Sequence, residues 1–374
     1  MIYLDNSATT RPRAESVAAI SHALTEGWGN PSSLHALGME AGRLLTQARK
    51  DVALALGAEP DRVFFTSGGT EADNWAIFSA AKRLGKRGKH LVTTAVEHHA
   101  VLHPMKELEL QGFEVTYLQP DETGTVTVEA LQAALRPDTI LVSVMMVCNE
   151  TGAVMPLQQM IRAVRRSCPE ALFHTDAVQG FLKLPFKAKS LGADLISISG
   201  HKICGPKGIG ALYVRPGLNL PPLLHGGGQE KNLRSGTEPL PAIAGFGAAA
   251  KAGFEELAAE LAHLTALRDD CAEKLGKLEG VQILGSHEAP HIVCLSVPGL
   301  RSQGIINCLQ DRGIYVSAGS ACAKGHRSHA LEAMGLPAPV LDGAIRVSFG
   351  RDNRLEDVDA LCDGLRHAIA TLKG

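Results

Sequence analysis

The chain of 374 residues is long enough for roughly two or three structural units that bury a large core. Its hydrophobic share of 45% and charged share of 20% are those of a folded protein and exclude a disordered or collagen-like chain. A net charge of −2 without any long basic run argues against nucleic acid as a ligand. No apolar stretch reaches the ~18 residues of a membrane helix and no signal-like leader is visible, so we expect a cytoplasmic protein without a membrane anchor.

Short β-branched or aromatic runs alternate with helical stretches from about residue 60 onward. This alternation predicts a mostly parallel sheet wrapped by helices. The predicted strands span residues 62–66, 90–95, 114–119, 139–147, 172–175, 195–199 and 209–214. The predicted helices between them span residues 73–84, 100–111, 128–135 and 157–166.

The composition changes near residue 250, where residues 248–278 are rich in good helix formers and predict one long helix. Strands are predicted at residues 281–284, 291–297, 314–316 and 344–348, and apolar residues three or four apart from residue 355 onward predict a closing amphipathic helix. We therefore expect an α/β fold. Its large domain, residues 12–255, holds a seven-stranded sheet, and a smaller α+β domain comprises residues 1–11 and 256–374.

Candidate ligand-binding groups lie where predicted parallel strands end, which is where open α/β sheets bind ligands. Strand 62–66 runs into the stretch TSGGT at 66–70, and a helix follows. A glycine-rich turn before a helix presents free N–H groups to an anion, so it is a candidate phosphate cradle. An ordinary helix cap with two turn glycines explains the same pattern, and the Walker sequence is absent.

Two further groups make a particular cofactor plausible. Asp176 follows strand 172–175, and Lys202 follows strand 195–199 ahead of a Gly/Pro turn. Most such residues are helix caps or solvated lysines. Together with a phosphate cradle, however, a carboxylate and an activated lysine amine are the groups that bind pyridoxal 5'-phosphate.

Asn149 and His98 follow predicted strands of the same sheet and should face the same crevice. His98 could stack on the cofactor ring and move protons, because the unperturbed imidazole pKa lies near 6.5. His99 and His103, four residues apart, raise the alternative of a metal site. The zincin pattern is missing, because Ala100 rather than Glu follows His99, and we expect no metal.

Cys322 is the candidate nucleophile. It lies in the stretch SAGSACAKGHR at 317–327, where Lys324, His326 and Arg327 would favour its thiolate. The other cysteines lie mostly in apolar patterns, and the wide spacing of all eight excludes CxxC pairs and zinc ribbons. A loop thiol without a role is the alternative.

Taken together, these stretches resemble the cysteine desulfurases of the iron–sulfur-cluster and nitrogenase-maturation type, in the class V aminotransferase family. The resemblance covers almost the whole chain. It is carried by YLDNSATT at 3–10, GNPSSLH at 29–35, FTSGGTEADN at 65–74, EHHAV at 97–101, NETG at 149–152, FHTDAVQ at 173–179, SGHKICGPKGIGALYVR at 199–215, GGGQE at 226–230, RSGTEP at 234–239, SAGSACAKG at 317–325 and IRVSFGR at 345–351.

The resemblance implies pyridoxal phosphate fold type I, with Lys202 as the lysine that forms the Schiff base with the cofactor. Asp176 would pair with the pyridine nitrogen, Gln179 would bond the phenolic oxygen and His98 would stack on the ring. The residues implied to hold the phosphate are Gly69, Thr70, Ser199 and His201.

The resemblance also implies a homodimer, because Thr237 matches a residue that reaches the phosphate of the other subunit. Arg346 and Asn149 match the groups that hold the carboxylate of the substrate L-cysteine. Cys322 matches the nucleophile that takes the sulfur as a persulfide and leaves L-alanine as product.

The loop resembles the SGSAC type, and the RxGHHCA pattern of the other desulfurase branch is absent. It is about two residues shorter than expected, which leaves open whether the sulfur acceptor is an iron–sulfur scaffold or a thiolation factor. Alternative functions are a selenocysteine lyase or another class V enzyme, a non-catalytic sulfur relay or scaffold, and a metal hydrolase built on the histidines.

Overall fold

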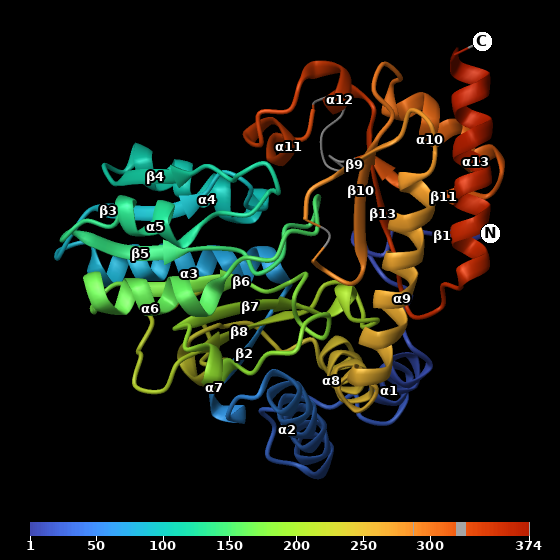
Figure 1. Ribbon diagram of the computed structural model, residues 1–374. Coiled ribbons are helices and arrows are strands. Elements are labelled where there is room, and N and C mark those ends of the chain that lie inside the picture. Colours follow the sequence, from blue (N-terminus) through green and yellow to red (C-terminus); the bar gives the residue numbers. More distant parts are fainter. Residues whose placement is uncertain (287, 319–326, 374) are drawn as a thin grey trace.

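A seven-stranded sheet forms the centre of the larger unit, in the order β2-β8-β7-β6-β5-β3-β4 (Figure 1). Strand β8 is antiparallel to both of its neighbours, and all other adjacent pairs are parallel. The strands are β2 (Val63–Thr66), β3 (His90–Thr94), β4 (Glu114–Leu118), β5 (Thr139–Ser143), β6 (Leu172–Asp176), β7 (Leu195–Ser199) and β8 (Gly210–Val214). The predicted fold class and all seven predicted strands are confirmed, with β5 shorter than expected.

Helices cover both faces of this sheet because alternate strand residues enter opposite apolar cores. Phe64 packs with α3 (Gly69–Leu84) and α4 (His99–Leu110). Val63 and Phe65 belong to the core on the other face. The helices of the larger unit that contribute to that second core are α2 (Ala36–Leu56), α5 (Val128–Ala134), α6 (Leu157–Ser167), α7 (Ala188–Leu191) and α8 (Leu240–Glu255).

The computed structural model describes residues 1–286, 288–318 and 327–373. In the smaller unit, a four-stranded antiparallel sheet has the order β12-β13-β10-β9, and a separate parallel pair joins β1 to β11. The strands are β1 (Ile2–Tyr3), β9 (Gln282–Leu284), β10 (Ile292–Ser296), β11 (Ile314–Tyr315), β12 (Ser317–Ala318) and β13 (Ala344–Ser348).

Three helices pack along one side of the smaller unit (Figure 1): α9 (Leu257–Gly276), α10 (Ser302–Asp311) and α13 (Leu355–Lys373). Two short helices, α11 (His329–Ala333) and α12 (Ala338–Asp342), complete it. Its apolar core includes Leu4, so the N-terminal residues pack with the C-terminal part of the chain. We propose a domain division at residues 12–255, which is supported by the second core of the smaller unit, although Ile292 and Ala330 of that unit pack in the core of the larger one. Among the described residues, no helix has the length and apolar character needed to cross a membrane.

The prediction of one helix over residues 248–278 is wrong, because the chain forms α8 and α9 with a break at Glu256. α8 is buried in the core of the larger unit, whereas Leu264 and Leu275 of α9 enter that of the smaller unit. Arg13 binds Glu256, at the break, at 2.8 Å and Glu260, in the first turn of α9, at 2.7 Å. Helix propensity carries no signal for this change of direction. The helix α1 (Ala14–Thr25), like α2, lies in a part of the chain for which no element was predicted.

The close contact of α8 with α2 generates a stability prediction. A Cβ atom at Gly247 would lie 2.6 Å from Cα of Ala48, whereas no described atom lies within 4 Å of the same position at Gly276. Gly247→Ala should therefore lower the free energy of unfolding by about 1–3 kcal/mol. Gly276→Ala, the control, should change it by less than about 0.5 kcal/mol. Urea unfolding followed by circular dichroism measures both, and equal midpoints would contradict the packing described.

Candidate active site

A cavity of about 380 Å³ lies at the carboxyl ends of the parallel strands. Most of the residues predicted from sequence as site residues line it together. They are Gly69, Thr70, His98, Asn149, Asp176, Gln179, Ser199, His201, Lys202 and Arg346. For all of them except Arg346, which comes from β13 of the smaller unit, the juxtaposition follows from topology, because they end or follow strands that terminate at the same edge of the seven-stranded sheet. The individual roles assigned to them remain proposals.

Two predicted residues are not part of this cavity in the described structure. Thr237 is exposed on the loop before α8 and does not line the cavity, so its role across a dimer interface stays a prediction. Cys322 lies outside the described residues.

Lys202 ends the short helix η2 (Gly200–Lys202) that follows β7. Its Nζ donates hydrogen bonds to the carbonyl oxygens of Ser7 and Ala8, the second at 2.8 Å. Both of these N-terminal residues also line the cavity. The motif YLDNSATT contains them, but nothing in its pattern indicated that its carbonyl groups contact the lysine.

Asp176 is the last residue of β6 and is 6% exposed. Its Oδ1 accepts a hydrogen bond from the N–H of Val178 at 2.8 Å. Burial raises the pKa of Asp176 to about 7, and the nearby carboxyl group of Asp73 adds to this. A cationic N–H group in the cavity would lower it again, because opposite charge favours the carboxylate.

A buried histidine two residues earlier in β6 links this strand to its two neighbours, β5 and β7. His174 lies 2.8 Å from the hydroxyl of Ser143 through Nδ1 and 3.0 Å from that of Ser197 through Nε2. Burial lowers the pKa of His174 to about 4, so the ring is neutral at pH 7.

His98 caps the N-terminus of α4, where its Nδ1 accepts the N–H of Ala100 at 3.1 Å. The neutral ring therefore carries its proton on Nε2. Burial, and next the charge of Lys202, lower the pKa of His98 to about 4. The ordinary pKa assumed from sequence does not apply here, and a neutral imidazole faces the cavity.

The turn before α3 has the properties of a phosphate cradle. A Cβ atom at Gly69 would lie 2.7 Å from Cγ2 of Val178, and one at Gly210 would lie 2.7 Å from the carbonyl carbon of Gly68. These close approaches require glycine at both positions. The N-terminus of α3 lies at the cavity through Gly69 and Thr70, and the N–H groups of a helix N-terminus bind anions. The donors at this end fit a phosphate.

Arg346 on β13 also lines the cavity and is 2% exposed. Its Nη1 donates to the carbonyl of Asn149 at 2.8 Å, and its Nη2 donates to Asp5 at 2.9 Å. The buried Nε has no hydrogen-bond partner among the described atoms. An unsatisfied buried guanidinium donor beside a cavity fits an anionic ligand.

Gln179 is held in one orientation by its neighbours. Its Nε2 donates to the carbonyl of Ser7 at 2.9 Å, and its Oε1 accepts from Nε2 of His291 at 3.2 Å. One amide hydrogen remains for a ligand, since a carboxamide carries two.

Asp73 lines the cavity and was not found from sequence. It lies on α3, is 1% exposed, and has its Oδ1 3.4 Å from Nε2 of His174. Burial raises the pKa of Asp73 to about 7. The signal available in the sequence was its spacing from Thr70. Residues three apart in a helix lie on the same face, so Asp73 faces the same side of α3 as Thr70.

The histidines that suggested a metal form a stack of rings. The ring centroids of His99 and His103 are 5.0 Å apart, and His329 lies 4.7 Å from His99. Within the described part of the chain, no group of three His, Cys, Asp or Glu side chains is arranged to hold a metal ion.

Comparisons with known proteins agree with this geometry. Residues 2–361 match the family model described as aminotransferase class-V. A protein named cysteine desulfurase IscS from Methanosarcina thermophila is 42% identical, over 100% of this chain and 93% of its own length. The solved structure titled NifS-like protein is 38% identical, with a TM-score of 0.94 and coverage of 99% of this chain and 100% of that one. Another, titled SspA in complex with cysteine, is 33% identical, with a TM-score of 0.81 and coverage of 93% and 99%.

The raised pKa of Asp73 generates a prediction about stability and pH. The pKa of Asp73 is about 7 in the folded protein and roughly 4 in the unfolded chain. The folded state therefore binds the proton more tightly, and the stabilisation that this gives is complete below pH 4 and is lost as the pH rises through 7. Asp73→Asn does not titrate. Relative to the wild type, its free energy of unfolding should therefore increase by on the order of 2 kcal/mol from pH 5 to pH 8.

Urea unfolding of the cofactor-free proteins at both pH values measures this difference. Asp311→Asn, at an exposed position at the end of α10, is the control and should show no such change. If the free energies of unfolding of Asp73→Asn and the wild type differ by the same amount at both pH values, the raised pKa of Asp73 is contradicted.

Proposed function

This chain belongs to the aminotransferase class-V family, as a cysteine desulfurase, and we propose that it converts L-cysteine to L-alanine and retains the sulfur as a persulfide on Cys322. The observation that carries the proposal is the cavity in which a lysine amine, a buried carboxyl group and a phosphate cradle meet. These are the groups that pyridoxal phosphate requires, and the family implies that cofactor.

The residues of the cavity fit pyridoxal phosphate at each end. Lys202 would be joined to its aldehyde carbon, and Asp176 would hold its pyridine nitrogen protonated. When bound, the cofactor withdraws electrons from the attached amino acid, which weakens the bonds at its α- and β-carbons. The phosphate would be held by Gly69, Thr70, Ser199 and His201.

Two neighbouring side chains would hold the ring. His98, neutral and fixed by its bond to the N–H of Ala100, would stack on the ring without adding a second positive charge. Gln179 would donate its remaining amide hydrogen to the phenolic oxygen. Both side chains are held by protein contacts, so they would be in place before substrate binds.

Arg346 and Asn149 would orient the substrate through its carboxylate. The unsatisfied Nε of Arg346 supports this role, as does the similarity to a solved structure titled as a complex with cysteine. Lys202 would move the α-proton of the substrate through its Nζ. The thiolate of Cys322 would attack the sulfur of the substrate, so that one S–S bond forms as the C–S bond breaks. The electron pair of the broken bond would stay with the substrate carbon, which takes up a proton before alanine leaves.

We further propose a cytoplasmic homodimer that passes sulfur to an acceptor protein, such as an iron–sulfur scaffold or a thiolation factor. Thr237 would contribute to the phosphate site of the partner protomer. Large apolar side chains near α1 and α2 support an interface between copies, because they are strongly exposed in the single chain. They are Val17, Leu24, Trp28, Leu34, Leu37 and Met39.

The first test replaces Lys202. Lys202→Ala should abolish the visible absorbance that pyridoxal phosphate acquires when it is joined to a lysine, and with it sulfide release from cysteine. Lys277→Ala, exposed at the end of α9, is the control and should keep both. A wild-type protein that stays colourless after addition of the cofactor would contradict the proposed function.

The second test separates the cofactor from the nucleophile. Cys322→Ser should bind pyridoxal phosphate as the wild type does but release no sulfide from cysteine above background. Cys308→Ser, a partly exposed cysteine in α10, should retain full activity. Mass spectrometry of wild-type protein given cysteine should find one added sulfur atom on Cys322. Normal sulfide release by Cys322→Ser would assign the chemistry to another group.

A further inference from the structure

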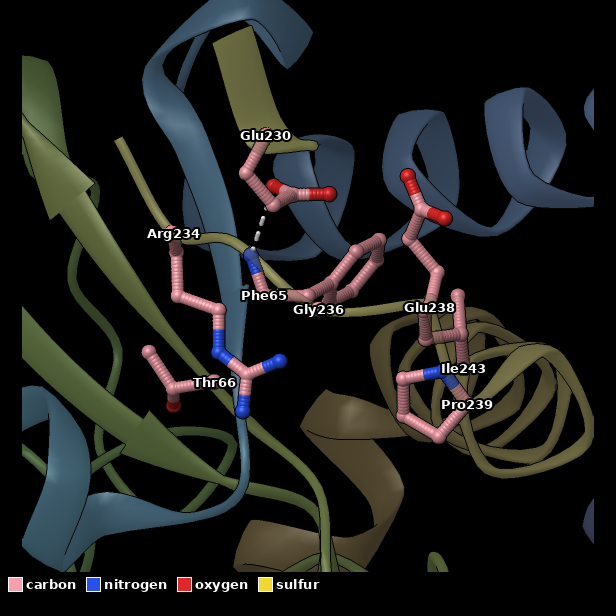
Figure 2. Close-up of a pocket in the computed structure, with 8 residues that line it drawn as sticks. All are labelled: Phe65, Thr66, Glu230, Arg234, Gly236, Glu238, Pro239 and Ile243. Carbon is pink, nitrogen blue, oxygen red and sulfur yellow. Dashed lines mark hydrogen bonds between the residues drawn. The ribbon is translucent and has the colours of Figure 1, made fainter. Parts of the chain in front are cut away.

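The segment before α8, residues 224–238, is held at two points, one on strand β2 and one in the first turn of α3. Glu230 and Arg234 reach from it toward β2 and, with Phe65 and Thr66, line a small cavity there (Figure 2). The segment ends close to Thr237, which the proposed function assigns to the phosphate of the partner protomer. Its attachment to the sheet therefore bears on the phosphate end of the site.

The first tie is the buried carboxylate of Glu230, whose side chain is 2% exposed. Arg49 of α2 donates to it through Nη1 at 2.7 Å and Nη2 at 2.5 Å, and the N–H of Phe65 donates at 2.9 Å. Three donors to one carboxylate, two of them from a planar guanidinium, form a rigid anchor.

The backbone at this anchor is strained. Glu230, Lys231 and Asn232 have φ values of 48°, 58° and 65°, so three successive residues with side chains adopt the left-handed conformation. L residues avoid it, and it persists where surrounding contacts enforce it. Strain of this kind is concentrated at segments whose placement matters for function.

The second tie ends at the phosphate cradle. Arg234 donates through Nε to Oε1 of Glu71 at 2.7 Å and through Nη2 to Oε2 at 3.0 Å. Oε2 of Glu71 also accepts the N–H of Ser67 at 2.9 Å. Glu71 lies in the first turn of α3, directly after Gly69 and Thr70. One carboxylate therefore joins the guanidinium to the turn whose backbone would bind phosphate.

We propose that Arg234 is a positioning residue for the phosphate end of the site: through Glu71 it holds the turn at residues 67–70 in its anion-binding shape. The proposal rests on the proposed function, because it assumes that this turn holds the phosphate of pyridoxal phosphate. Arg234 itself does not line the main cavity. It acts through the carboxylate of Glu71, with its own position set by the Glu230 anchor four residues earlier.

Arg234→Lys tests this, because lysine keeps the charge but not the planar fork. The dissociation constant of pyridoxal phosphate for the cofactor-free protein should rise about tenfold or more, the effect of losing a charge-assisted hydrogen bond. The dissociation constant of pyridoxal, which has no phosphate, should not change. A general structural defect would weaken both compounds alike, and that result would overturn the proposal.

Arg136→Lys is the matched control, since Arg136 forms the same fork with Asp138, through Nε and Nη2 at 3.0 Å each, away from the cavity. It should bind both compounds as the wild type does. Glu71→Gln should reproduce the effect of Arg234→Lys, and the double variant should bind no more weakly than either single variant.

Unchanged binding of pyridoxal phosphate by Arg234→Lys, with normal wild-type binding, would overturn this inference alone. Failure of the wild-type protein to bind the cofactor would overturn the proposed function, and the inference with it.

Discussion

The structure depends on bringing ionisable groups out of water at the carboxyl edge of one sheet. Asp176 ends β6 and Lys202 follows the neighbouring parallel strand β7, so the sheet itself places an amine and a carboxyl group in the same cavity. Hydrogen bonds compensate both groups for the loss of contact with water. Carbonyl oxygens of Ser7 and Ala8 accept from the lysine, and the N–H of Val178 donates to the aspartate. Charges held in this way interact more strongly with a bound ligand than they would in water, because the surrounding dielectric constant is lower.

Burial also decides which groups around the cavity are charged. The pKa of His98 and of His174 falls to about 4, so both rings are neutral at pH 7. The pKa of Asp73 and of Asp176 rises to about 7, so each carboxyl group responds to whatever cation enters the cavity. The site is thus poised for a ligand that brings positive charge next to Asp176 and negative charge to the turn before α3.

The site combines distant parts of the chain. The N-terminal strand β1 pairs with β11, and Leu4 packs in the smaller core, which leaves the carbonyls of Ser7 and Ala8 at the cavity. β13 contributes Arg346, and Asp5 binds that arginine from the N-terminal segment. The substrate end of the proposed site therefore needs both units, whereas the phosphate end belongs to the larger one. The ion pair of Arg234 with Glu71 adds a loop far along the chain to that phosphate end.

The sequence by itself determined the sheet and the main site residues. Alternating apolar runs separated by helical periods specify parallel strands, and the strand ends of such a sheet meet, so Asp176, Lys202 and the turn at 66–70 could be placed together from local pattern. Four other features depend on packing between distant segments, and only the tertiary structure revealed them. The break at Glu256, the contacts of Ser7 with Lys202 and Gln179, the burial of Asp73 and the neutral state of His98 all belong to this group. Local helix propensity and residue spacing do not indicate which distant segment will pack against a side chain. That packing sets the direction of the helices here, and the burial that comes with it sets the protonation state of His98 and Asp73.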